Sequence, residues 1–421
     1  MILWKDESKL LNRKGVTTVF LMVMISSLLS AFTVFLGAAK AKSFDAAVDS
    51  MGEVWAQSVI GSYDRNLYSR FGIMGYLGEN DLVEREIDYF AKISFSQDPY
   101  AHYRDVQTFS DDYSLCRTET FKEQIRAAAL MHTEEGGGLS LLGSKGIGEE
   151  PAETGQVYQA SSDRKICNES VWRALPSYGR GEENWGEGLK TLLGSHLNFD
   201  DIFDRSVDTL ACDRYVRNHF YSARRVSETD NSFFRYEKEY IICGKNSDMD
   251  NLKGVKKKII LAREGMNLLF LETDPGMQAL TLEAATALAG PAAPAAQQAL
   301  MAAWALLESE NDYLLLINGK KVPFHKDTAS WATHLEGIGQ AAVQGYIDPG
   351  NETGQDYEDY LSLFLFLLKP ERKYGRMMDL VQIDMKYCYY SDFLLKDYFT
   401  GVRFRLHVNG KDHEFEDNYA K

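Results

Sequence analysis

The chain has 421 residues and a formal net charge of −15, with 46 Lys and Arg against 61 Asp and Glu. With 45% apolar and 12% aromatic residues, it can bury a sizeable core, and we expect two globular units. The acidic balance argues against nucleic-acid or anionic-lipid binding, which needs clustered Lys and Arg. The five cysteines form no CxxC pair, so the sequence contains no zinc or thioredoxin-like motif.

The first predicted element is a membrane-spanning helix. Gly15–Ala39 is an uncharged run of 25 residues that includes Phe20 and the small residues Ser26 and Ser30. At about 1.5 Å per residue, such a helix is about 37 Å long and can cross a hydrocarbon core of about 30 Å. Lysines and arginines are concentrated in residues 1–14, so the positive-inside rule predicts a cytoplasmic N-terminus and an extracytoplasmic remainder.

Two alternatives to a retained anchor remain open. A cleaved signal peptide also begins with basic residues and ends in small ones such as Ala39, although its apolar region usually spans about 7–15 residues. A buried core helix is the other alternative, but such helices rarely run this far without a charge.

The predicted helix continues beyond the membrane segment. Apolar residues recur there at spacings of three and four, which places them on one face of a helix. This helix stripe consists of Phe44, Val48, Met51, Trp55 and Val59. No proline interrupts the chain here, so we expect one helix from about Val16 to Ile60, with the stripe packed on the protein's own globular part.

The remaining chain divides by composition into three predicted parts. Residues 40–132 form an N-terminal extracytoplasmic unit, with a short strand near Asp105–Phe109. Residues 133–198 are rich in Gly, Glu and Ser and indicate a flexible insertion. Residues 199–421 form a C-terminal α+β unit. The predicted fold class is therefore α+β and helix-dominated, with short strands and hairpins.

Short strands are expected at three places in the C-terminal unit. Glu239–Cys243 is β-prone, and Tyr313–Ile317 precedes the hairpin signal Asn318-Gly319. Gly401–Val408 and a partner strand alternate around Asn409-Gly410 and predict a closing hairpin. The predicted helices of this unit span residues 204–225, 248–271, 279–289, 295–309, 357–368 and 377–389.

Several motifs resemble known pilin-like proteins. The segment RKGVTTVFLMVM (Arg13–Met24) resembles the start of TadE/TadG-like proteins of the Tad (Flp) pilus system. It is most similar to a related Gram-positive (Firmicute) family of unknown function. Five further segments resemble that family in the same order: 62–76, 119–132, 237–271, 303–326 and 357–385. The resemblance implies a pilin-like helix, a surface location and other pilus or secretion proteins as partners.

One position departs from the pattern of processed prepilins. These proteins usually carry Glu at the fifth position after the cleaved glycine, whereas this chain has Phe20 five residues after Gly15. We therefore expect a permanently anchored accessory protein and not a major filament subunit.

The search for catalytic motifs finds little. There is no GxSxG or HExxH motif, and GLSLLGSK (Gly138–Lys145) departs from the phosphate-binding consensus. Polar residues that interrupt apolar segments predict a buried structural network instead, because an unsatisfied buried donor costs about 1–3 kcal/mol. Its expected members are Glu239, Arg263, Glu264, Asn267 and Glu308.

The sequence therefore favours a non-enzymatic, single-pass protein of the cell membrane in a Tad/Flp-like pilus or secretion apparatus. It predicts no cofactor, metal or nucleic acid and leaves the oligomeric state open. The alternative is an independent ligand-binding or hydrolytic domain tethered outside the membrane by one helix.

Overall fold

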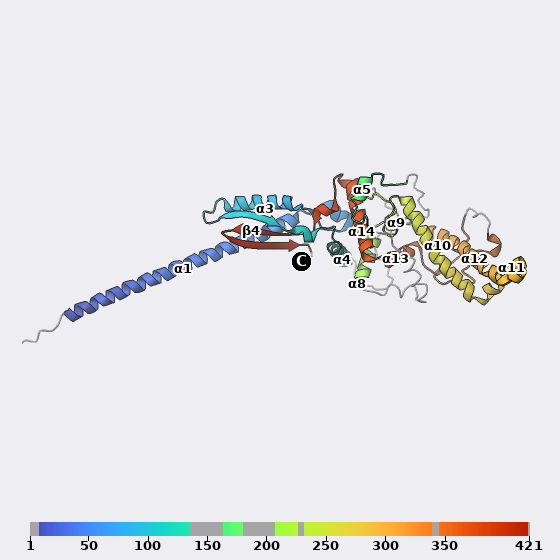
Figure 1. The fold of residues 1–421 in the computed structure, drawn as a ribbon, viewed down its shortest axis with the longest axis horizontal. Coiled ribbons are helices and arrows are strands. Elements are labelled where there is room, and N and C mark those ends of the chain that lie inside the picture. The colour runs from blue at the N-terminus through green and yellow to red at the C-terminus, as the bar shows by residue number, and fades with distance from the viewer. Residues whose placement is uncertain (1–7, 135–162, 180–206, 226–230, 339–344, 420–421) are drawn as a thin grey trace, which may run out of the picture.

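The molecule is an elongated α+β protein dominated by helices (Figure 1). The computed structural model describes residues 8–134, 163–179, 207–225, 231–338 and 345–419. Helix α1 (Ser8–Gly61) projects from one end, followed by a small sheet and a body of helices. Helices α10 (Asp248–Thr273), α11 (Pro275–Ala289) and α12 (Ala293–Ile317) form the opposite end.

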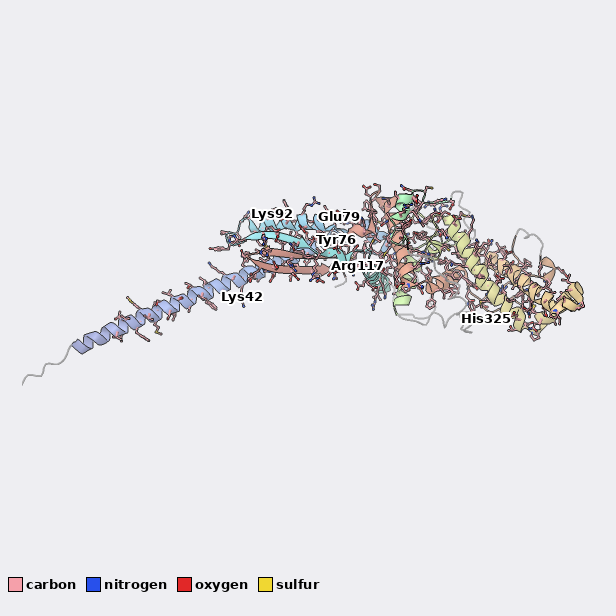
Figure 2. All side chains as sticks on the ribbon, in the orientation of Figure 1. Lys42, Tyr76, Glu79, Lys92, Arg117 and His325 are labelled. Atoms are coloured by element: carbon pink, nitrogen blue, oxygen red, sulfur yellow. The ribbon has the colours of Figure 1, made fainter. Side chains whose placement is uncertain are left out.

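Helix α1 is continuous through the predicted membrane segment and the helix stripe. Its 54 residues correspond to about 81 Å at 1.5 Å per residue. Val48, Trp55 and Val59 are buried, and Phe44 and Met51 pack against the same cluster. Figure 2 shows Lys42 near the point where α1 leaves the globular part. The stripe therefore covers this protein's own sheet unit.

A three-stranded antiparallel sheet packs on the outer half of α1. Its order is β2 (Tyr103–Thr108), β4 (Gly401–Val408) and β5 (Lys411–Asn418), and α3 (Asn80–Phe95) packs against β2. The predicted hairpin is confirmed: Asn409 and Gly410 both have positive φ, 53° and 73°, as a two-residue type I′ turn requires. The predicted strand near residues 105–109 is confirmed as β2.

The C-terminal hairpin joins the N-terminal part of the chain. Residues 401–418 were expected in the unit 199–421, but their apolar side chains share one cluster with the helix stripe and α3. The reason is backbone pairing, since β2 alone would leave its N–H and C=O groups without partners. Strand β4 lies between β2 and β5 and bonds to both.

The second and largest apolar cluster holds the helical body together. A two-stranded ribbon of β1 (Tyr76–Leu77) and β3 (Tyr398–Phe399) links this body to the sheet unit, because Tyr398 packs in the cluster of the body and Phe399 in that of the sheet unit. The body's helices, besides the inner parts of α10 and α12, are α2 (Arg65–Phe71), α4 (Thr118–Glu134), α5 (Glu169–Arg173), α8 (Val207–His219), α9 (Glu237–Cys243), α13 (Tyr357–Leu367) and α14 (Pro370–Asp384).

Two strand predictions were wrong. The segment Glu239–Cys243 belongs to helix α9, which ends at Gly244 in the left-handed conformation with φ 62°. Tyr313–Ile317 is the last part of α12, so Asn318-Gly319 ends a helix and does not form a hairpin. Both segments are short and apolar, and periodicity cannot separate a buried strand from a buried helix at that length. Tertiary burial decided the outcome.

The predicted insertion falls mainly outside the described residues. Residues 135–162, including GLSLLGSK, and residues 180–206 are not described, whereas 163–179 contain α5. The N-cap of α10 also differs from expectation. Ser247, and not Asp248 or Asp250, is the capping residue, and its hydroxyl accepts from the Asp250 N–H at 3.2 Å.

A close approach between α1 and β5 gives a test of this packing. A Cβ at Gly52 would lie 2.3 Å from the Phe415 ring, so we predict that Gly52→Val lowers the free energy of unfolding by about 1–3 kcal/mol. Urea unfolding of the detergent-solubilised chain measures this change. Gly61→Val is the matched control, because nothing lies within 4 Å of that position on the same helix. Equal effects of the two variants would contradict the packing.

Candidate functional site

Three of the five residues predicted to form a polar network lie in one buried cluster around Arg263, together with two residues that the sequence did not indicate. The side chains of Arg263, Asn267 and Glu308 are fully or almost fully buried and lie in one cluster with Asp312 and Lys326. Glu264 is half-buried and, among the described residues, makes no hydrogen bond with the cluster. Glu239 lies on α9 in a separate network. We call the five-residue cluster the polar layer.

The guanidinium of Arg263 donates to partners on three sides. Its Nε donates to Asp312 Oδ2 at 2.9 Å, and its Nη2 donates to Asn267 Oδ1 at 3.0 Å. Its Nη1 donates to the Tyr360 hydroxyl at 3.1 Å and to the backbone carbonyls of Pro323 and Phe324 at 3.0 and 2.9 Å. These bonds connect α10 to α12, α13 and the segment after α12.

The ammonium of Lys326 lies between two carboxylates of α12. Its Nζ donates to Asp312 Oδ1 at 2.6 Å and to Glu308 Oε1. Glu308 also accepts two backbone N–H groups, from Ala332 at 2.9 Å and from Thr333 at 2.8 Å. Both carboxylate oxygens of Glu308 therefore accept hydrogen bonds from the protein.

The polar layer separates two apolar clusters. On α12, Ala305 belongs to the cluster at the far end of the molecule, whereas Tyr313 and Leu315 belong to the cluster of the helical body. Glu308 and Asp312 lie between them. The layer contains two cations and two carboxylates, so its formal charge is zero. Burial raises the pKa of Asp312, but the nearby Arg263 and Lys326 outweigh burial and hold it below its usual value.

The sequence analysis missed two members of the polar layer, Asp312 and Lys326, and only Asp312 had a signal in the sequence. Glu308 and Asp312 are four residues apart and share a helix face, but the strand prediction for residues 313–317 ended the expected helix too early. Lys326 lies in an irregular segment after α12, where no periodicity indicates burial. Only the tertiary structure brings it to α12.

Helix α9 carries three consecutive buried charged residues, each with different partners. Glu237 pairs with Arg70 of α2 at 2.8 Å, and Lys238 pairs with Glu358 of α13 at 2.5 Å. Glu239 Oε1 accepts from the Tyr357 hydroxyl at 2.8 Å and from a backbone N–H at 2.9 Å. This short helix is thereby fixed to its neighbours on several sides.

Glu239 is the least satisfied of these groups. Its Oε2 is buried and, among the residues that the structure describes, has no hydrogen-bond partner. Burial raises the pKa of Glu239 from 4.5 to about 7, although the hydrogen bonds from Tyr357 and the Ala223 N–H partly oppose the shift.

Two further buried carboxyls have raised pKa values. Asp384 lies 3.2 Å from Arg70, and burial together with the nearby Glu237 raises its pKa well above the usual value. Burial also raises the pKa of Asp379 to about 6, and Tyr240 and Ser177 donate hydrogen bonds to it. Perturbed carboxyls can mark catalytic sites when they face a cleft.

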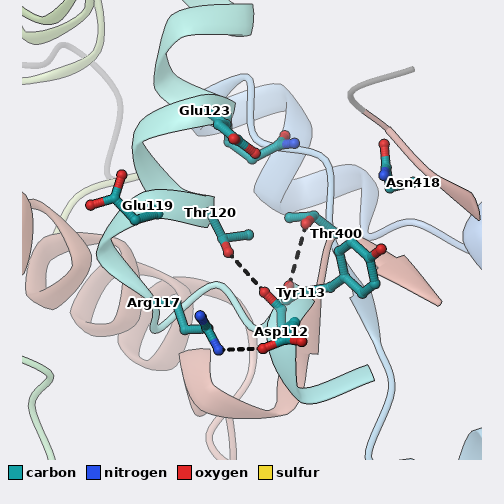
Figure 3. A pocket seen from close by; sticks show the side chains of 9 residues that line it. Asp112, Tyr113, Arg117, Glu119, Thr120, Glu123, Thr400 and Asn418 are labelled. Atoms are coloured by element: carbon teal, nitrogen blue, oxygen red, sulfur yellow. Dashed lines mark hydrogen bonds and ion pairs between the residues drawn. The ribbon is translucent and has the colours of Figure 1, made fainter. Parts of the chain in front are cut away.

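Two surface hollows are lined by residues other than these carboxyls. One, of about 190 Å³, lies beside Arg117, which pairs with Asp112 at 2.6 Å (Figure 3). The other, of about 320 Å³, lies between α1 and β5 and is lined by Glu53 and by residues 414–417. Within the described chain, no group of three His, Cys, Asp or Glu residues could hold a metal ion. Glu239, Asp379 and Asp384 line neither hollow.

The predicted anchor residues lie on the uncovered half of α1. Gly15 lies within α1. The side chains of Phe20, Ser26, Ser30 and Ala39 are exposed, and Phe20 is 67% exposed. The Ser26 hydroxyl donates to the Val23 carbonyl at 2.9 Å, so this polar group is satisfied within the helix. One helix of the described chain, α1, is long and apolar enough to cross a membrane.

Comparison with known proteins gives one match. The model of a family of unknown function (DUF5702) matches residues 157–410. The matched range contains α9 to α14, both partners of each ion pair in the polar layer, and strand β4. No curated protein and no solved structure matches the chain.

The polar layer predicts a large effect of removing its central cation. Arg263→Leu leaves a fully buried Asp312 without its guanidinium partner, and breaking a buried pair costs about 3–5 kcal/mol. Urea unfolding monitored by tryptophan fluorescence measures the loss. Lys257→Leu, an exposed lysine on the same helix, is the control and should change stability by less than about 0.5 kcal/mol. An unchanged stability of Arg263→Leu would overturn the structural role.

Glu239 predicts a specific pH dependence. Its raised pKa means that the folded chain holds a proton that the unfolded chain releases, so its contribution to stability is complete below pH 4.5 and is lost as the pH rises through about 7. Between about pH 5 and pH 8, we expect the wild type to lose up to about 3 kcal/mol more stability than Glu239→Gln. Urea unfolding at both pH values measures this difference. Glu264→Gln should follow the wild type, and parallel profiles for all three proteins would contradict the prediction.

Proposed function

The chain belongs to this family of unknown function, and we propose that it is a non-enzymatic, single-pass membrane protein. In this proposal α1 anchors the chain in the cell membrane and holds the globular part outside the cytoplasm. The protein acts there as an accessory component of a pilin-like apparatus of the Tad/Flp type. The observation that carries the proposal is the uncovered apolar half of α1, joined without a break to a half that packs on the sheet.

The uncovered half of α1 needs an apolar environment. The most apolar 18 residues of α1 are not buried by the rest of the described protein. Large apolar side chains such as Phe20 and Phe35 are therefore exposed on this half of the helix. Apolar surface in water is unfavourable by about 25 cal/mol per Å², so an exposed helix of this length favours lipid. Its backbone groups are paired within the helix, as a membrane span requires.

The remainder of α1 supports a pilin-like arrangement. The helix stripe packs on an antiparallel sheet, so the membrane segment and the globular part form one rigid piece. A short flexible linker would have uncoupled them. The resemblance of residues 13–24 to TadE/TadG-like proteins implies the same combination of anchor and packed helix.

The polar chemistry supports a role without catalysis. The buried carboxyls Glu237, Glu308 and Asp312 are held by cations or backbone N–H groups. None of the three lines the two hollows described above. An accessory role also fits Phe20, because it provides no carboxylate to neutralise a new N-terminal amine after cleavage at Gly15.

The topology is directly testable. We predict that the full-length chain fractionates with membranes and that protease added to wall-stripped cells digests the region after Lys42. Mass spectrometry of the purified protein should find a terminal peptide that contains Met1 or Ile2, because the basic residues 1–14 stay in the cytoplasm.

A variant with charges in the uncharged run tests whether this segment is what holds the chain in the membrane. A variant with Leu21→Lys and Leu28→Lys places two charges in the membrane segment, each costing about 2.5–3.5 kcal/mol at the centre of a span, and should reduce membrane association. Soluble release with a new terminus near Lys40 would contradict the anchor. A dominant terminus at Val16, found in filaments, would contradict the accessory role and indicate a pilin-like subunit.

A further inference from the structure

The amine of Lys326 is buried, although lysine side chains usually lie at the protein surface. Its side chain is 1% exposed, and the two carboxylates that contact it, Glu308 and Asp312, are fully buried. The Trp331 ring covers the amine, with Nζ 5.6 Å from the ring centroid, and Trp331 contacts Trp304 at 5.1 Å between centroids. Water is thus excluded from an amine that touches a carboxyl group.

We propose that Lys326 and Glu308 condense to an intramolecular amide, a covalent cross-link between α12 and the segment that follows it. The bond joins Lys326 Nζ to Glu308 Cδ and releases one water molecule. The chemistry needs a neutral amine, a neutral carboxylic acid and a group that transfers a proton. The polar layer provides all three without an external reactant.

The reaction begins with a proton transfer inside the ion pair. Lys326 Nζ donates a proton to Glu308 Oε1, which converts two buried charges into a neutral amine and a neutral acid, the forms that a low dielectric favours. The amine then attacks Cδ, and negative charge develops on Oε2. The Thr333 N–H, 2.8 Å from Oε2, stabilises this charge.

Asp312 completes the proton balance. Its Oδ1 lies 2.6 Å from Lys326 Nζ and accepts the proton that the attacking nitrogen must lose. Asp312 passes this proton to the hydroxyl formed at Oε1, which leaves as water while Oε2 returns to a carbonyl. Asp312 ends as a carboxylate, as it began, so it is neither consumed nor charged in the net reaction.

The arrangement distinguishes Glu308 from Asp312 as the reacting acid. Asp312 Oδ2 accepts from Arg263 Nε at 2.9 Å and from Asn267 Nδ2 at 3.0 Å, and these bonds favour its charged form. Glu308 Oε2 instead faces the Thr333 N–H, a donor placed to stabilise the negative charge that develops on an attacked carboxyl group. Amide formation removes the charges of Lys326 and Glu308, and the remaining charges, on Arg263 and Asp312, are of opposite sign and paired.

Mass spectrometry of the full-length protein tests the cross-link. We expect the intact, denatured chain to be lighter than its sequence by the mass of one water molecule. Trypsin should not cleave after Lys326, because its amine is acylated, and fragment ions should join Lys326 to Glu308. A full sequence mass with normal cleavage after Lys326 would overturn the proposal, and an amide at Asp312 would overturn the assignment of Glu308.

Two lysine variants separate this bond from other losses of water. Lys326→Arg keeps the positive charge but has no nucleophilic amine, so it should recover the full sequence mass. Lys321→Arg is the matched control at an exposed lysine of the same segment and should keep the mass loss. A mass loss that persists in Lys326→Arg would place the dehydration elsewhere and overturn the proposal. Because the wild-type mass is decisive by itself, misfolding of a variant would not rescue a negative result.

Discussion

The continuity of α1 is the constraint on which the rest of the molecule depends. One helix contains an uncharged, uncovered segment and, one turn further on, a stripe that closes the core of the sheet unit. Sharp bends in helices almost always occur at a proline, a Gly/Ser pair, a π-bulge or an inserted side chain or water, and α1 is a continuous α-helix without proline. The direction of the apolar segment is therefore fixed relative to the globular part, and an environment that holds the segment also orients the sheet and the helical body.

The sheet unit is assembled from both ends of the chain. Strand β4 pairs with β2 from the N-terminal region, and Phe415 of β5 lies against the bare backbone at Gly52 of α1. The matched family range begins after α1 and ends at the β4–β5 turn. The matched range therefore contains β4 and most helices of the helical body, whereas the helix stripe, α2, α4 and β5 lie outside it.

Buried charges connect the elements of the helical part. The polar layer lies between two apolar clusters, and Glu237, Lys238 and Glu239 of α9 connect to α2, α13 and the chain before α9. Buried ion pairs contribute little net stability over apolar residues, but breaking one is costly. They consequently favour one arrangement of the helices over alternatives that would leave a charge unpaired.

The sequence by itself determined the long helix, its apolar segment and stripe, the C-terminal hairpin and the presence of a buried Arg263–Asn267 pair. These features follow from local signals: runs without charge, spacings of three and four, and Asn-Gly between alternating residues. The tertiary structure alone decided that residues 313–317 are helical, that the hairpin joins the N-terminal unit, and that Lys326 reaches Glu308 and Asp312. The physical reason is that burial on several sides removes periodicity, and contacts between distant residues leave no pattern in the local sequence.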